Sequence, residues 1–321
     1  MNNFKSLLGE YLQGFLDFRV AQGYSKTTYI GTLRSIDKFY SEKYPEERNL
    51  TPSIVHEWIK FNSGCSVSNL HQKVSVIRLL GRYMSSYGIN PYIIPDKFIP
   101  DRRRNSSYIF SDIDLFKLFK TTDKICIKGN PFATYQLPVM FRLIYTCGLR
   151  PQEGRLLQWK NVNVNTGEIL ITRTKRNKER IVVMSDEMLS LYKRYDNIRQ
   201  CTYPDSIYAF PNTNGESYTS SCLRKYFNKC WQQSNPDIPK SELTQVRIYD
   251  LRHRFASAVL NQWLDEKKDL GAMIPYLQAY MGHDLLSSTA GYIHMLPENL
   301  VKSPGVDWES MRKLIPEVNS K

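Results

Sequence analysis

The sequence predicts a mainly α-helical protein with a small antiparallel β-sheet, arranged as two domains. Three observations support this fold class. Apolar residues recur three or four residues apart, the spacing of helices, through most of the chain. Residues 162–184 instead alternate apolar and polar side chains, as strands do. Residues 89–107 contain three prolines and three consecutive arginines, which indicates a stiff linker between the domains.

The first expected domain, residues 1–100, contains four helices that form a small bundle. An apolar stripe from Leu8 to Phe18 marks the first helix, and Gly23 ends it. Ser25 is expected to cap the second helix, and the pair Thr51–Pro52 marks the start of the third. The fourth helix carries apolar residues at helical spacing: Leu70, Val74, Ile77, Leu80 and Tyr83 or Met84.

A basic linker is expected at residues 101–110. It contains Arg102, Arg103 and Arg104, which form either a basic clamp or an ordinary solvated charge run. The second domain, residues 111–321, opens at a capping box of sequence SDID, residues 111–114. An apolar helix is expected at residues 131–147, a two-stranded sheet within residues 162–184, and helices from Asp186 to the end.

The composition favours a polyanionic partner. The chain has 321 residues, of which 41% are hydrophobic, and its 44 Lys and Arg against 31 Asp and Glu give a net charge of +13. This excess fits nucleic acid or an anionic membrane surface, with a merely soluble basic protein as the alternative. No apolar run approaches the roughly 20 residues of a membrane span, and the N-terminal stretch lacks a signal cleavage site. We therefore expect a cytoplasmic protein with no membrane partner.

The six cysteines predict free thiols. They show no CxxC or other metal-ligand spacing, so we expect a reducing compartment and no metal site. They are Cys65, Cys126, Cys147, Cys201, Cys222 and Cys230.

Four segments carry candidate chemistry, and each also has an ordinary structural interpretation. In the first, Arg150 precedes Pro151 at a helix start, where the guanidinium and free backbone N–H groups suit a phosphate and Glu153 can hold the guanidinium in place. The alternative is an ordinary surface pair of Arg150 and Glu153. The second is the expected hairpin tip, a solvated turn or a groove-binding element whose charged residues are Arg173, Lys175, Arg176, Lys178, Glu179 and Arg180.

The third segment is the helical stretch YDLRHRF. Tyr249, Arg252 and His253 share one face of the helix, and Asp250 is expected to pair with Arg254. In the fourth, YMGHDLLSSTAGYIHM, Gly282 ends a helix directly before His283, and Tyr292 follows nine residues later. Taken singly, a buried arginine or one tyrosine among 21 is most simply a structural residue.

In their order and spacing, these segments resemble the tyrosine recombinase (phage integrase) family. The motifs cover about residues 107–295, and the four-helix part is similar to the core-binding domain of that family by architecture alone. The resemblance implies an N-terminal helical core-binding domain and an α+β tyrosine-recombinase catalytic domain. It implies site-specific cleavage and rejoining of DNA through a covalent 3′-phosphotyrosine. The alternatives are a catalytically degenerate DNA-binding accessory protein and a type IB topoisomerase-like enzyme.

The resemblance also implies a role for each candidate residue. Arg150 and Arg252 would hold the scissile phosphate, which would make a phosphate rather than a protein carboxylate the partner of Arg252. Lys175 would protonate the leaving 5′ oxygen. It lacks the glycine neighbours usual in the family, and this leaves Lys178 as the alternative. His283 would donate a hydrogen bond to a phosphate oxygen, and Tyr292 would be the nucleophile. Glu153 would support the site.

Tyr249 departs from the family pattern. The family usually places histidine three residues before the second arginine, and a tyrosine is a poor proton acceptor near neutral pH. Either Tyr249 only hydrogen-bonds, or another group takes the proton of Tyr292. His253 is the nearest such group, although it is expected to be structural first.

The implied partner is double-stranded DNA, without cofactor or metal. The two domains would clamp the duplex, with phosphate contacts from Arg102, Arg103, Arg104, Arg173, Arg176 and Lys178. We expect a monomer in solution and a homotetramer on DNA. A short amphipathic helix within residues 303–317 would dock on a neighbouring protomer or on its own domain.

Overall fold

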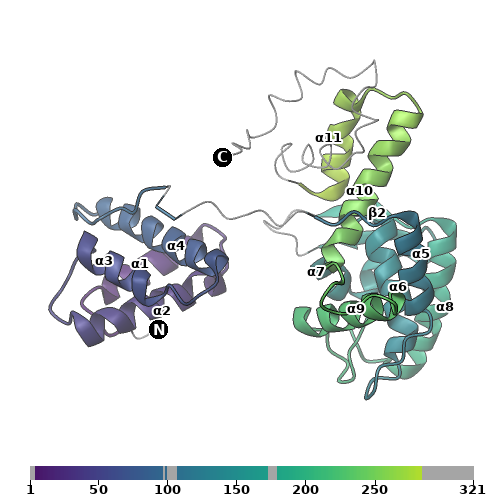
Figure 1. Cartoon of the computed structure of the whole chain (residues 1–321), viewed down its shortest axis with the longest axis horizontal. Helices are drawn as coiled ribbons and strands as arrows, with labels where there is room; N and C mark the ends of the chain where they lie inside the picture. Colours follow the sequence, from purple (N-terminus) through teal and green to yellow (C-terminus); the bar gives the residue numbers. More distant parts are fainter. Residues whose placement is uncertain (1–3, 97, 100–106, 173–178, 284–321) are drawn as a thin grey trace. The chain divides into compact units, whose positions relative to one another are not determined.

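The chain divides into two compact units, Met1–Asn105 and Ser106–Lys321, in a computed structural model (Figure 1). The structure describes residues 4–96, 98–99, 107–172 and 179–283. The boundary between the units falls inside the expected linker, residues 101–110. Each unit has its own hydrophobic core.

The N-terminal unit contains the four predicted helices. They are α1 (Gly9–Ala21), α2 (Lys26–Lys43), α3 (Pro52–Phe61) and α4 (Val67–Ser85). Thr51 and Pro52 begin α3 as predicted. Ser25 occupies the N-cap position of α2, but its hydroxyl bonds Thr27 Oγ1 at 2.7 Å and makes no bond to the helix backbone. Phe18 of the predicted apolar stripe is 47% exposed.

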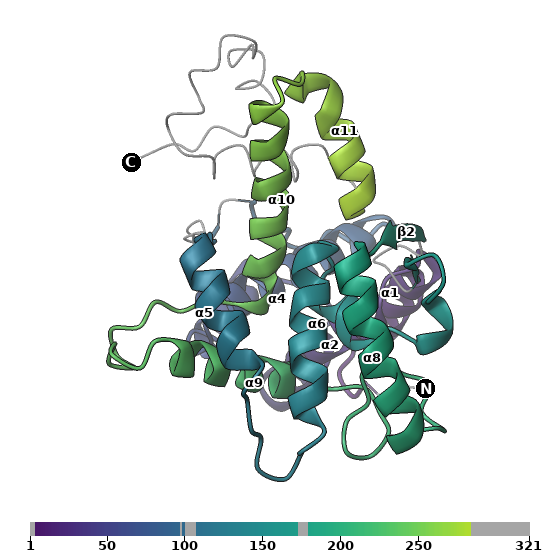
Figure 2. The same cartoon turned by 90° about the vertical axis from the view of Figure 1, so that its right-hand side faces the viewer.

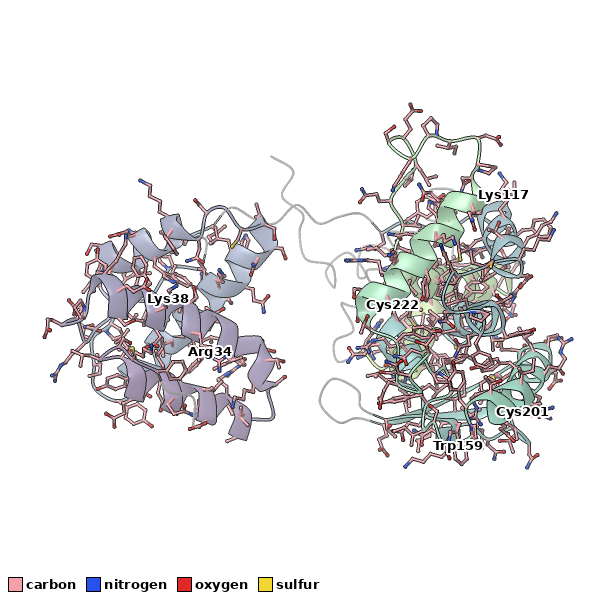
Figure 3. All side chains as sticks on the ribbon, turned by 90° about the horizontal axis from the view of Figure 1, so that it is seen from below. Arg34, Lys38, Lys117, Trp159, Cys201 and Cys222 are labelled. Carbon is pink, nitrogen blue, oxygen red and sulfur yellow. The ribbon has the colours of Figure 1, made fainter. Side chains whose placement is uncertain are left out.

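The surface of this unit displays basic side chains at helical spacing. Arg34 and Lys38, one turn apart on α2, are both exposed (Figure 3). Arg78 of α4 binds the segment that follows this helix: its Nε donates a hydrogen bond to the Ile94 carbonyl at 2.7 Å. Arg78 also lies 3.3 Å from a carboxylate oxygen of Asp96.

The C-terminal unit is helical with one small sheet, as predicted. Strands β1 (Glu168–Ile171) and β2 (Arg180–Val183) pair antiparallel, with Glu168 opposite Val183 and Ile171 opposite Arg180. The remaining elements are α5 (Asp112–Thr122), α6 (Ala133–Thr146), α7 (Pro151–Arg155), η1 (Trp159–Asn161), α8 (Asp186–Thr202), α9 (Ser220–Ser234), α10 (Ile248–Asp265) and α11 (Leu270–Met281). The predicted capping box of Ser111 and Asp114 opens α5.

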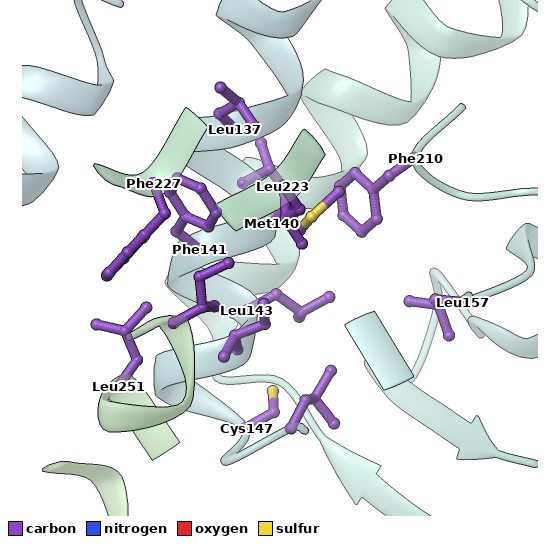
Figure 4. Close-up of a cluster of buried hydrophobic side chains, with 14 of the residues drawn as sticks. Leu137, Met140, Phe141, Leu143, Cys147, Leu157, Phe210, Leu223, Phe227 and Leu251 are labelled. Carbon is purple, nitrogen blue, oxygen red and sulfur yellow. The ribbon is translucent and has the colours of Figure 1, made fainter. Parts of the chain in front are cut away.

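Helix α6 is the centre of the main core. Its apolar residues cover most of its circumference, so it packs against α5, α8 and α10 at once. Figure 4 shows Met140, Phe141 and Leu143 of α6 among side chains of other elements, including Phe227 of α9 and Leu251 of α10. This packing fixes the C-terminal end of α6, where the Arg150 motif begins.

Helix α10 belongs to two hydrophobic clusters. Leu251, near its start, packs in the main core, whereas Leu260 and Leu264 pack against Leu270 and Ile274 of α11. Figure 2 shows α10 running out of the body of the unit with α11 beside it. Arg252 therefore lies at the junction of the two clusters.

The cysteines and the membrane prediction can be compared with the structure. All six cysteines are free thiols, and Cys201 and Cys222 lie well apart in Figure 3. No helix in the described parts of the chain is long and apolar enough to cross a membrane. Within those same parts, no group of three His, Cys, Asp or Glu side chains is arranged to hold a metal ion.

Candidate functional site

The site begins at the turn after α6. Gly148 adopts a left-handed conformation with φ of +59°, and the Gly148 and Leu149 amides bond back to Tyr145 and Ile144 at 3.3 and 3.1 Å. A Cβ at position 148 would approach the Phe255 ring to 2.5 Å, so glycine is required here for space as well as for conformation. The turn directs the chain into α7, with Arg150 at its N-cap.

Arg150 and Glu153 form the predicted ion pair. Arg150 Nη1 donates to Glu153 Oε1 at 2.8 Å, and the Arg150 backbone amide donates to Glu153 Oε2 at 2.7 Å. The second terminal nitrogen of Arg150, Nη2, donates to the carbonyl of Gly282. Pro151 supplies the first helical residue without a surplus N–H, so the short helix can hold Glu153 beneath the arginine.

Arg252 is fully buried behind this pair. Its Nη1 donates to the Gly148 carbonyl at 2.6 Å, and its Nη2 donates to the Met281 carbonyl at 2.6 Å. Arg252 Nη2 also lies 3.0 Å from His283 Nε2. Glu153 Oε2 is 3.9 Å from Arg252 Nη1, so a protein carboxylate does approach Arg252, and the phosphate partner stays a prediction.

The C-terminal end of α11 brings His283 to the arginines. Gly282 ends the helix with φ of +63°, as predicted, and the His283 amide bonds back to the Gln278 carbonyl at 3.0 Å. Three successive carbonyls here accept hydrogen bonds from three arginines: Tyr280 from Arg180, Met281 from Arg252 and Gly282 from Arg150. The negative end of a helix dipole favours these contacts.

Arg180 belongs to the site, although in the sequence it is only one of the six charged residues of the expected hairpin tip. Its Nη1 and Nη2 donate to Glu153 Oε1 and Oε2 at 2.9 and 2.7 Å, a bidentate pair. Alternation along β2 could have identified it, because Arg180 shares a strand face with the buried Val182.

The site carries excess positive charge in the residues that the structure describes. Three guanidiniums, from Arg150, Arg180 and Arg252, surround the single carboxylate of Glu153. Burial alone would raise the pKa of Glu153, but the hydrogen bonds and charge of Arg180, with those of Arg150, lower it to about 2. Two positive charges are therefore left to attract an anion.

His283 is neutral in this environment. Burial, and then the charges of Arg252, Arg150 and Arg180, lower the pKa of His283 to about 3. Its Nε2 atom faces Arg252 Nη2, which is a donor, so Nε2 accepts and the imidazole proton lies on Nδ1.

The ring of Tyr249 lies beside the ring of His253, which is one turn further along α10. The two rings are 5.0 Å apart at 61°, in an edge-on arrangement. Burial lowers the pKa of His253 to about 4, although the charge of Asp250, 4.0 Å from Nε2, opposes this shift. His253 is consequently a weak base in the folded protein.

The predicted pair of Asp250 with Arg254 is wrong. Asp250 is the third residue of α10, so its carboxylate reaches back to the Arg247 amide at 2.8 Å and to Arg247 Nη2 at 2.9 Å. Arg254 points across to α5 and donates to Asp112 Oδ1 at 2.5 Å.

Several predicted residues lie outside the described parts of the chain. They are Arg102, Arg103, Arg104, Arg173, Lys175, Arg176, Lys178 and Tyr292, and the expected tail helix within residues 303–317 falls there too.

A sequence model of the phage integrase family matches residues 116–299, a range that contains Arg150, Glu153, Arg180, Arg252 and His283. The chain belongs to the phage integrase family. A protein of Sinorhizobium fredii named as an integrase/recombinase, y4rE, is 25% identical over 297 residues, covering 91% of this chain and 93% of that protein. The tyrosine recombinase XerD of Rickettsia prowazekii is 24% identical over 315 residues, covering 92% and 94%.

The fold agrees with this family membership. The solved Tn1549 transposon integrase matches with a TM-score of 0.67 at 15% identity, covering 95% of this chain and 99% of that one. The family model matches within the C-terminal unit alone, whereas the two relatives align over about nine-tenths of the chain.

Proposed function

We propose that this member of the phage integrase family is a site-specific recombinase. It cleaves DNA strands through a covalent 3′-phosphotyrosine on Tyr292 and rejoins them. The observation that carries the proposal is the convergence of Arg150, Arg252 and His283. They come from three separate parts of the chain and meet where α6 and α11 end.

The chemistry follows from the charge of the site. A phosphodiester repels an attacking anion, and its charge grows further in the transition state. Arg150 provides positive charge and a planar set of donors for the phosphate oxygens, and the buried guanidinium of Arg252 adds fixed positive charge beside it, which is electrostatic preorganisation. His283 adds a neutral donor. Glu153 fixes the arginines without cancelling their joint charge.

The reaction conserves the energy of the phosphodiester bond. The phenol of Tyr292 gives its proton to solvent as its oxygen bonds to phosphorus, the bond from phosphorus to the 5′ oxygen breaks, and Lys175 gives that oxygen a proton. The 5′ hydroxyl of a DNA strand then attacks the phosphotyrosine and releases Tyr292. The steps are transesterifications, so no external energy source is consumed.

The proposed partner is double-stranded DNA. The net charge of +13 supports it, as does the solved Tn1549 integrase, whose structure is in complex with circular intermediate DNA. We assign core binding to the N-terminal unit and catalysis to the C-terminal unit, with a tetramer assembled on DNA. Relatives such as XerD align over the length of both units, which supports this division.

A degenerate DNA-binding protein is the second candidate, and Tyr249 is the observation that favours it. The histidine usual in the family is absent, and the nearest histidine, His253, is a weak base with a pKa of about 4. Such a protein would bind the same DNA and form no covalent adduct.

The test is covalent trapping on a nicked suicide duplex taken from DNA that flanks the gene. Wild type is expected to form an adduct that survives denaturation, and Tyr292→Phe is not. Tyr276→Phe is the matched control, because Tyr276 is 70% exposed on α11 and should leave trapping unchanged. An adduct in Tyr292→Phe would refute the assigned nucleophile, and DNA binding without any wild-type adduct would favour the accessory protein.

A further inference from the structure

Arg180 joins three elements of the C-terminal unit. It stands at the first position of β2, donates both terminal nitrogens to Glu153 on α7, and donates Nε to the Tyr280 carbonyl of α11 at 2.8 Å. The side chains of Arg180 and Glu153 are only 10% and 5% exposed. An ion pair this enclosed is costly to leave unmatched, so its geometry is tightly held.

We propose that Arg180 is a positioning residue for DNA cleavage: it holds Glu153 and the end of α11 so that Arg150 and His283 face the same phosphate. This inference rests on the proposed recombinase function. It adds a residue that itself need not touch the DNA.

The first route of action is through the carboxylate. Glu153 Oε1 accepts from both Arg180 Nη1 and Arg150 Nη1, at 2.9 and 2.8 Å. The direction in which Arg150 presents its guanidinium therefore depends on where Arg180 holds Glu153. A lysine at position 180 would keep the charge but could not span both carboxylate oxygens in one plane.

The second route is through the last turn of α11. The guanidinium packs against Gly282, where an added Cβ would lie 3.1 Å from Arg180 Nη1. Together with the bond to the Tyr280 carbonyl, this contact fixes the backbone that carries His283. Loss of the contact would displace His283 relative to Arg150, and a displacement of about 1 Å can cost about 100-fold in rate.

The test compares Arg180→Lys with Arg142→Lys. Arg142 is a matched control because it also makes a bidentate pair, with Asp123 at 2.6 and 2.8 Å, on α6 away from Glu153 and α11. Single-turnover cleavage of the nicked duplex is measured at saturating protein, with DNA affinity measured separately. We expect Arg180→Lys to lower the cleavage rate about 10- to 100-fold with less than about a 3-fold change in Kd, and Arg142→Lys to change neither.

A double variant separates positioning from a general loss of folding. Because one of its two routes runs through Arg150, Arg180→Lys should cost clearly less in an Arg150→Lys background than in wild type, and the loss that remains belongs to the His283 route. A merely structural role would instead multiply the two losses. That multiplicative result would overturn the inference, as would a wild-type cleavage rate in Arg180→Lys. If wild type forms no adduct at all, the recombinase proposal fails first, and the inference fails with it.

Discussion

Arg252 donates a hydrogen bond of 2.6 Å to the carbonyl oxygen of Gly148, which lies 104 residues earlier in the chain. The bond ties the start of α10 to the turn that follows α6. A second bond of 2.6 Å, to the Met281 carbonyl, ties the same guanidinium to the end of α11. Arg252 thus holds together the segments that carry Arg150 and His283.

Replacing Arg252 should affect folding as well as cleavage. Arg252→Met keeps much of the side-chain volume but leaves two buried carbonyls without their donor. We expect the free energy of unfolding to fall by about 3 kcal/mol, measured by urea denaturation, and covalent trapping to disappear. Arg254→Met is the control, because its partner Asp112 is 88% exposed and the pair should contribute less than about 1 kcal/mol. Equal destabilisation by both variants would contradict this assignment.

Gly282→Ala tests the close approach of Arg180 to the end of α11. The φ of +63° is unfavourable for alanine, and the new Cβ would press on Arg180. Gly129→Ala isolates the backbone cost, because Gly129 has φ of +80° and nothing within 4 Å of the added Cβ. We expect both to lose about 1 kcal/mol of unfolding free energy, and only Gly282→Ala to slow cleavage, in single-turnover assays. Similar cleavage rates in the two variants would show that the Gly282 contact is unimportant.

Stability should fall in acid in two stages. His253 and His283 have pKa values of about 4 and 3 in the folded protein, below the ordinary 6.5, so unfolding takes up protons. Their contribution is complete above pH 6.5 and is lost as pH falls towards 4 and 3, by up to about 1.4 kcal/mol per pH unit for each histidine. Glu153, with a pKa of about 2 against an ordinary 4.5, adds a loss below pH 4.5.

Urea denaturation at a series of pH values measures these slopes. His253→Gln should flatten the slope between pH 6.5 and 4, because one of the two proton uptakes is removed. A slope identical to that of wild type would mean that His253 is not held neutral by burial.

Tyr249 should be replaceable by the residue usual in the family. We expect Tyr249→His to keep or raise the cleavage rate, and Tyr249→Phe to lower it about 5-fold through loss of one hydrogen bond. Single-turnover cleavage measures both. A complete loss of cleavage in Tyr249→His would mean that position 249 requires the phenol ring.

The local sequence determined most of the elements of this fold. Helical spacing located the four N-terminal helices, alternation located β1 and β2, and the SDID box located the start of α5. These features depend on neighbours within a few residues, so periodicity and capping chemistry are sufficient to predict them. Gly282 was predicted as a helix end for the same reason.

Only the tertiary structure decided how the charged side chains are paired. The sequence placed Asp250 and Arg254 one turn apart, yet each found a different partner, Arg247 and Asp112. Alternation along β2 places Arg180 on the face of Val182, but its partners follow only from the contacts of β2 with α7 and α11. A guanidinium is long and has several donors, so its partners depend on which segments the core brings within reach, and those segments are remote in the sequence.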